Sequence, residues 1–169
     1  MIHIVVTGPE SSGKTTLSRE LAEMFDGILV EEYAREYVAN INRPYKLEDI
    51  AVIAEGQKKK LDAVQTEIIV SDTAFLVLKV WAQYRFDTVP ENVEMYLKTI
   101  PVDLYVLCHP EIPWEYDPLR ENPDSREELF EMYQQELEGM TVPYIIVRGT
   151  KTQRLQMVLD KMREQRNLV

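Results

Sequence analysis

The chain is 169 residues long, 45% hydrophobic and 28% charged, with six glycines and nine prolines. Its length is that of one domain, and its composition excludes collagen-like, low-complexity and disordered chains. The formal net charge of −10 disfavours nucleic acid and anionic membranes as partners, because both bind clusters of Lys and Arg.

The first apolar run predicts a buried strand of a parallel sheet, since residues 2–7 are short, β-branched and almost entirely apolar. Residues 8–15, GPESSGKT, fit the pattern G-x-x-x-x-G-K-[ST], and helical periodicity follows over 15–25. The two glycines allow positive φ and close approach to a phosphate, which backbone N–H groups and the helix N-terminus then hold. The alternative is a loop that only caps a helix. We predict that the nucleotide-binding residues are Gly8, Glu10, Ser11, Ser12, Gly13, Lys14, Thr15 and Thr16.

Short apolar runs alternate with helical periodicity along the rest of the chain. Such alternation predicts an α/β fold with a mostly parallel sheet of about five strands, flanked by helices, as one domain over 1–169. Further strands are expected at 27–30, 67–71, 104–107 and 144–147. Helices are expected at about 32–39, 47–65, 73–85, 92–98, 125–138 and 152–166.

Charged and aromatic side chains follow the second predicted strand, in the segment EEYAREY at 31–37. Ligands of open α/β sheets bind outside the carboxyl ends of the strands, so this segment is a candidate acceptor site. Carboxylates and tyrosines there suit a polar, cationic small molecule through charge pairing and cation–π contact. In the alternative interpretation, the tyrosines face the core. The candidate substrate-binding residues are Glu31, Glu32, Tyr33, Arg35 and Tyr37.

The strand predicted at 67–71 ends in a carboxylate, Asp72. In P-loop proteins an acidic residue at the end of a neighbouring strand contacts Mg²⁺, usually through water. We therefore predict that Asp72 and Thr15 bind the metal and that Lys14 reaches the β- and γ-phosphates. Alternatively, Asp72 is only a turn or an N-cap for the next helix.

Prolines at 110, 113, 118 and 123 predict an exposed loop over 109–124. Ser125 and Glu128 fit a capping box at the start of the next helix. Two arginines, Arg120 and Arg126, make the segment at about 109–126 a candidate lid, because guanidinium groups bind phosphate oxygens bidentately as charge develops. In the alternative interpretation, both arginines pair with neighbouring carboxylates. The acidity is local, with ten acidic and two basic residues over 111–138.

The single cysteine, Cys108, cannot form an internal disulfide, and no Cys/His cluster has zinc-ligand spacing. Residues 1–6 lack a basic region, and the longest apolar stretch, 74–82, is interrupted by Lys79. We therefore expect a cytoplasmic protein without a signal peptide or membrane span.

Four segments together carry a resemblance to a known family. The sequence lacks the elements D-x-x-G and N-K-x-D of switch GTPases and the element L-S-G-G-Q of transporter ATPases, which favours a small-molecule kinase among phosphate-loop proteins. The chain resembles the ribosylnicotinamide kinase domain of NadR-type NAD-biosynthesis proteins and its standalone relatives. The matching segments are GPESSGKTT at 8–16, EYAREY at 32–37, Asp72-Thr73 with KVW at 79–81, and DPLRENP at 117–123.

The resemblance implies a kinase-like α/β fold, ATP and Mg²⁺ as cofactors, and γ-phosphoryl transfer to the ribose 5′-hydroxyl of nicotinamide riboside. It assigns Glu32, Tyr33 and Arg35 to the acceptor side and Asp72 to metal binding or hydroxyl activation. Two positions depart from the family: Glu31 replaces an aromatic residue of bifunctional members, and Ala74 replaces a second acidic residue. With no room for an adenylyltransferase domain before Met1, we expect the kinase activity alone.

The function predicted from the sequence is an ATP-dependent kinase for nicotinamide riboside, with in-line attack by the acceptor hydroxyl. Asp72 or Glu32 would orient that hydroxyl. Two alternatives remain: a kinase for another nucleoside or a nucleoside monophosphate, and a nucleotide-binding regulatory module that acts through a partner protein. The candidate catalytic residues are Lys14, Asp72, Arg120 and Arg126.

Overall fold

The structure is a computed structural model that describes residues 1–117 and 120–167. Its strands are β1 (Ile2–Thr7), β2 (Ile28–Val30), β3 (Ile68–Asp72), β4 (Leu104–Cys108) and β5 (Tyr144–Val147). Its helices are α1 (Lys14–Met24), α2 (Tyr33–Asn40), α3 (Leu47–Asp62), α4 (Phe75–Phe86), α5 (Glu91–Thr99), α6 (Arg126–Glu138) and α7 (Lys151–Asn167).

The strands form one five-stranded sheet in the order β2-β3-β1-β4-β5, and every neighbouring pair is parallel. This arrangement confirms the predicted α/β fold. Because β1 lies at the centre, the loop that leaves it at Thr7 opens between the ends of β3 and β4. The carboxyl ends of parallel strands meet at one edge, where α/β proteins bind their ligands.

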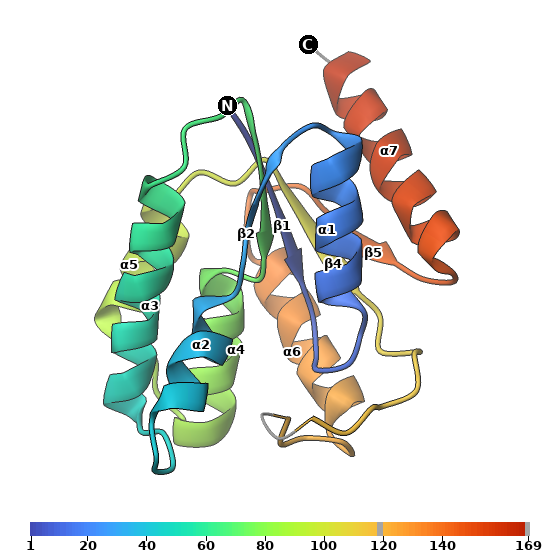
Figure 1. The fold of residues 1–169 in the computed structure, drawn as a ribbon. Helices are drawn as coiled ribbons and strands as arrows, with labels where there is room; N and C mark the ends of the chain where they lie inside the picture. Colours follow the sequence, from blue (N-terminus) through green and yellow to red (C-terminus); the bar gives the residue numbers. More distant parts are fainter. Residues whose placement is uncertain (118–119, 168–169) are drawn as a thin grey trace.

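Alternating side chains of the strands divide the core into two layers. Val5 of β1 packs with residues of α3 to α6, whereas Ile4 and Val6 pack with α1 and α7. Figure 1 shows α1 and α7 on one side of the sheet and α3 and α5 on the other. The central strand β1 therefore buries apolar side chains on both faces of the sheet, as predicted from the β-branched run at 2–7.

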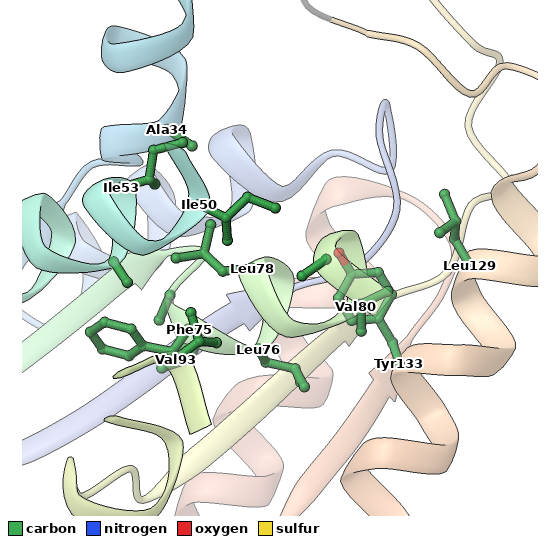
Figure 2. Packing of buried hydrophobic residues seen from close by; sticks show 14 of the residues in the cluster. Ala34, Ile50, Ile53, Phe75, Leu76, Leu78, Val80, Val93, Leu129 and Tyr133 are labelled. Atoms are coloured by element: carbon green, nitrogen blue, oxygen red, sulfur yellow. The ribbon is translucent and has the colours of Figure 1, made fainter. Parts of the chain in front are cut away.

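The layer around α4 extends from the deep core to the ligand-binding edge. In Figure 2, Leu78 of α4 lies next to Ile50 of α3, and Val80 lies next to Tyr133 of α6. Tyr133 is only 4% exposed. These packed side chains form a rigid wall, on which a site of fixed shape can be built.

Three details of the predicted helices are wrong. Helix α3 ends at Asp62 and not at residue 65. Helix α4 begins at Phe75, not at residue 73, because Thr73 has a positive φ of 62° and Ala74 is extended. The capping box at Ser125 does not form, and the Ser125 side chain makes no capping hydrogen bond. Its φ of −109° and ψ of 12° lie outside the β region that an N-cap residue adopts.

A buried histidine joins β1, β3 and the segment before β4. His3 is 3% exposed; its Nε2 lies 2.8 Å from the Ser71 hydroxyl and its Nδ1 lies 3.0 Å from the Pro101 carbonyl oxygen. Because that carbonyl only accepts, Nδ1 carries the proton and Nε2 accepts from Ser71. Burial lowers the pKa of His3 below 6.5, and the Pro101 carbonyl opposes this effect.

This histidine makes stability depend on pH. The unfolded chain binds the proton more tightly than the folded one, so the free energy of unfolding should fall as the pH drops below about 6.5. Urea denaturation at pH 7 and pH 5.5 measures this loss, which should be smaller in His3→Gln because glutamine does not titrate. Equal losses in both proteins would remove His3 as the cause.

Among the described residues, no helix combines the length and the apolar character needed to cross a membrane.

Candidate active site

The loop between β1 and α1 has the backbone shape of a phosphate-binding loop. Gly13 has φ 86° and Gly8 has φ 139°, conformations that favour glycine. A Cβ at Gly8 would lie 2.8 Å from the carbonyl oxygen of Cys108, so no larger residue fits there. The Ser12 hydroxyl and the Lys14 ammonium group both donate to the Pro9 carbonyl oxygen at 2.7 Å.

Asp72 lies beside this loop because β3 pairs with β1, with Val6 opposite Asp72. Asp72 is 5% exposed, and its Oδ1 is buried without a hydrogen-bond partner. Burial raises the pKa of Asp72, whereas the Thr15 hydroxyl and the Lys14 charge lower it. The fold thus brings together Lys14, Thr15 and Asp72, which the sequence analysis grouped as phosphate- and metal-binding residues.

A cavity of about 340 Å³ extends from the phosphate loop to an apolar wall. Glu32 and Arg35, at the start of α2, line it between the two ends. Burial raises the pKa of Glu32 and the charge of Asp72 raises it further, whereas Lys14 lowers it. A raised pKa makes a carboxylate a better proton acceptor.

Three of the predicted acceptor residues are absent from the cavity lining: Glu31, Tyr33 and Tyr37. The exposed Glu31 carboxylate lies 3.7 Å from Arg19. The Tyr37 hydroxyl donates to Asp49 at 2.8 Å, and Tyr33 and Tyr37 both pack against the core. The tyrosines thus match the alternative that treats them as packing residues, because they lie on a different face of α2 from the residues that line the cavity.

The sequence analysis did not identify the residues of the apolar wall. They come from α2, α4 and α6 and are Ala34, Val38, Val77, Val80, Trp81, Leu129 and Tyr133. Ala34, Val80 and Trp81 lie in segments shared with the resembling family, and this was the available signal. The other residues follow ordinary helical periodicity, and their patterns are those of core residues.

The proposed lid segment lies against the phosphate loop (Figure 1). The Arg120 guanidinium donates to the Ser11 hydroxyl at 3.4 Å and to the Glu115 carbonyl oxygen at 2.6 Å. The Arg126 guanidinium donates to the carbonyl oxygens of Ser11 and Ile112 at 3.3 and 2.8 Å. Within the described ranges neither arginine forms an ion pair, although the sequence left that alternative open. Pro118 and Leu119, which the lid prediction includes, lie outside the described residues.

Arg120→Ala should lower kcat more than it weakens ATP binding. Arg120 lines the cavity beside Ser11, and in a phosphoryl-transfer site a guanidinium at this position would stabilise charge that develops only in the transition state. We expect a loss of about a hundredfold in kcat, the scale of one preorganised donor, against a small change in the Kd of ATP. Equal changes in kcat and Kd would assign Arg120 to ground-state binding instead.

A buried arginine that the sequence analysis missed also holds the phosphate loop. Arg154 of α7 is 3% exposed and donates to the Ser12 carbonyl oxygen at 2.6 Å. Its guanidinium also donates to the carbonyl oxygens of His109 and Gly149 and to Glu111. Its position in a long amphipathic helix carried no signal, because this contact spans 142 residues of sequence.

The phosphate loop, the carboxylate at the end of β3 and the helix-covered parallel sheet define a P-loop nucleotide-binding protein with a nucleoside-kinase-like fold. The chain belongs to the family described as an AAA domain, whose model matches residues 3–154.

Known proteins similar to this chain confirm the resemblance to NadR-type proteins. The chain is 27% identical over 153 residues to the trifunctional NAD biosynthesis/regulator protein NadR of Escherichia coli (strain K12), a match covering 85% of this chain and 37% of that protein. The NadR protein in complex with NR superposes with a TM-score of 0.73 at 24% identity, covering 96% of this chain and 51% of that one. The chain thus spans about half, or less, of the length of these relatives.

Two further solved structures share the fold. The NadR protein in complex with NAD and AMP-PNP has a TM-score of 0.70 at 24% identity, over 96% of this chain and 49% of that one. Deoxyadenosine kinase from M. mycoides has a TM-score of 0.66 at 14% identity, over 96% and 100% of the two chains.

Proposed function

We propose that this protein is an ATP-dependent kinase that phosphorylates the ribose 5′-hydroxyl of nicotinamide riboside. The observation that carries the proposal is the continuous cavity, in which the phosphate loop forms one end, the apolar wall forms the other and the Glu32 carboxylate lies between them. A transfer reaction needs this arrangement, because donor phosphate and acceptor hydroxyl must be in line within one site.

ATP and Mg²⁺ fit the donor end. The Thr15 hydroxyl and the partnerless Oδ1 of Asp72 are oxygen ligands, which Mg²⁺ prefers in combination with substrate phosphates. Bound there, the metal would neutralise charge on the β- and γ-phosphates. The solved structure of the NadR protein with AMP-PNP supports ATP as the donor.

The acceptor end suits a flat cationic ring attached to a ribose. Trp81 and Tyr133 offer aromatic surface, and Glu32 offers negative charge between the ring site and the phosphate loop. Cation–π contact and charge pairing favour nicotinamide, which is cationic in its riboside, over neutral bases. The NadR structure with NR supports the same choice.

In the proposed reaction, the 5′-oxygen attacks the γ-phosphorus while the bond to the β-phosphate oxygen breaks, and ADP leaves. Glu32 or Asp72 orients the hydroxyl and accepts its proton. Lys14, Arg120 and Arg126 stabilise the charge that develops on the transferring group and on ADP. The lid, which contacts Ser11 of the phosphate loop, would keep water away from the transferring group.

A steady-state assay of ADP formation tests the function. The rate is measured with nicotinamide riboside, with other nucleosides, with nucleoside monophosphates and without any acceptor. ADP formation should depend on nicotinamide riboside. Turnover only with another acceptor would assign a different kinase substrate. Nucleotide binding without any acceptor-dependent turnover would favour the regulatory module.

Glu32→Gln should reduce kcat by about a hundredfold, because general-base catalysis contributes at least that much. The amide keeps the shape of the side chain but cannot accept the proton. In the unmodified protein, kcat/KM should fall as the pH drops through the raised pKa of Glu32, since only the carboxylate is active. Stopped assays across pH 5 to 8 measure both effects, with Glu36→Gln, on the exposed side of α2, as the matched control. A Glu32→Gln variant with the same kcat would leave Asp72 as the orienting carboxylate.

A further inference from the structure

Three side chains outside the catalytic groups meet beside the acceptor cavity: Tyr45, Arg85 and Glu121. They come from the segment before α3, the end of α4 and the lid. The Arg85 guanidinium donates to Glu121 Oε2 at 2.6 Å and to the Tyr45 hydroxyl oxygen at 3.0 Å. The Tyr45 hydroxyl donates to the same Glu121 oxygen at 3.1 Å. One lid carboxylate oxygen therefore receives both donors.

This cluster touches the acceptor wall through the Tyr45 ring. Tyr45 is 5% exposed, and its ring centroid lies 4.6 Å from that of Trp81, which lines the cavity. The Arg85 guanidinium lies 4.3 Å from the Tyr45 ring centroid. Trp81, Tyr45 and Arg85 therefore form one continuous series of packed side chains from the acceptor cavity to the lid carboxylate.

The same cluster touches the phosphate loop through the lid backbone. The backbone N–H groups of Glu121 and Asn122 donate to the Glu10 carboxylate at 3.0 and 3.1 Å. The preceding residue, Arg120, reaches Ser11. Glu121 thus joins the acceptor wall by its side chain and the phosphate loop by its backbone.

We propose that Tyr45, Arg85 and Glu121 are positioning residues that couple acceptor binding at Trp81 to closure of the lid over bound ATP. Acceptor and ATP then bind cooperatively, since each stabilises the same lid position. The coupling thereby stabilises the lid position in which Arg120 reaches the phosphate loop. The proposal rests on the kinase function proposed above, which supplies the two ligands.

The alternative is a surface ion pair that serves stability alone. The Arg85 and Glu121 side chains are 38% and 40% exposed, and such pairs contribute little to stability. A purely structural pair would alter the melting temperature without altering cooperativity between the ligands. Cooperativity is therefore the measurement that separates the two interpretations.

The test is isothermal titration calorimetry with AMP-PNP and Mg²⁺, in the absence and presence of saturating nicotinamide riboside. We expect the acceptor to tighten AMP-PNP binding by about tenfold, within the usual range of coupling between sites. Glu121→Gln and Arg85→Gln should each reduce this factor to near one, and the double variant should lose no more than either single variant. Tyr45→Phe, which keeps the ring, should retain part of the coupling.

Asp62→Asn is the matched control, because it removes an exposed ion pair with Lys58 on α3 and should retain the full coupling. Melting curves establish that every variant is folded. Undiminished coupling in Glu121→Gln and Arg85→Gln would overturn the proposal. Independent binding of the acceptor and AMP-PNP to the unmodified protein would also overturn it. If nicotinamide riboside does not bind at all, the proposed function fails together with this inference. Acceptor-dependent turnover without cooperative binding contradicts only the inference.

Discussion

Lys14→Ala is expected to reduce the kcat of phosphoryl transfer by about a thousandfold or more. Lys14 is the first residue of α1 and lines the donor end of the cavity. Its ammonium group bonds the Pro9 carbonyl oxygen, and it must exchange this contact for the β- and γ-phosphates when ATP binds. A preorganised charge of this kind stabilises the transition state more than the ground state.

The measurement is initial-rate ADP formation at saturating ATP and acceptor. Lys161→Ala is the control, since Lys161 lies in α7 and pairs with Glu164, and it should retain the full rate. Lys14→Ala should keep its melting temperature within a few degrees, because the ammonium group supports only one backbone carbonyl. A variant with the full rate would contradict the proposed mechanism.

Asp72→Asn is expected to reduce kcat by about a hundredfold and to raise the Mg²⁺ concentration needed for half-maximal rate. The Oδ1 atom of Asp72 is buried and has no protein partner, so a metal ion at the phosphates is the ligand it suits. A neutral amide removes the charge that holds the ion, and metal catalysis supplies several kcal/mol of transition-state stabilisation. Because burial raises the pKa of Asp72, the Mg²⁺ requirement of the unmodified protein should also increase as the pH falls.

Mg²⁺ titrations of the rate separate this role from a structural one. Asp160→Asn, at an exposed pair with Arg163, should need no more Mg²⁺ than the unmodified protein. A lower rate at every Mg²⁺ concentration with an unchanged midpoint would assign Asp72 to orienting the acceptor hydroxyl. An unchanged rate would remove it from the site.

The sheet and the phosphate loop were predictable from sequence because their signals are local. Residues 2–7 form β1 as predicted, since a short apolar β-branched run permits little else. The motif at 8–15 needs particular residues at particular positions, because a Cβ at Gly8 meets the backbone of Cys108. Asp72 was predicted from its place at the end of an apolar strand, and the pairing of β3 with β1 then brings it beside the phosphate loop.

The acceptor end was less predictable because its residues come from separate helices. Helical periodicity gave no means to separate Tyr133, which lines the cavity, from Phe130, which fills the core. The segment at 31–37 contains six polar or aromatic residues, five of which were candidates for substrate binding. Which of them face the cavity, as Glu32 and Arg35 do, depends on the rotation of α2 about its axis, and the sequence does not give that rotation. Arg154 could not be predicted as a phosphate-loop contact, because Ser12, whose carbonyl oxygen it binds, lies far away in the chain.

The product of a single turnover tests the central claim most directly. The protein is mixed in excess over Mg²⁺-ATP labelled at the γ-phosphate, with nicotinamide riboside present, and the products are identified by mass spectrometry and ³¹P NMR. We predict labelled riboside 5′-monophosphate in the unmodified protein and almost none in Lys14→Ala over the same reaction time. Unmodified riboside, with all the label in ATP or in inorganic phosphate, would contradict the proposed function.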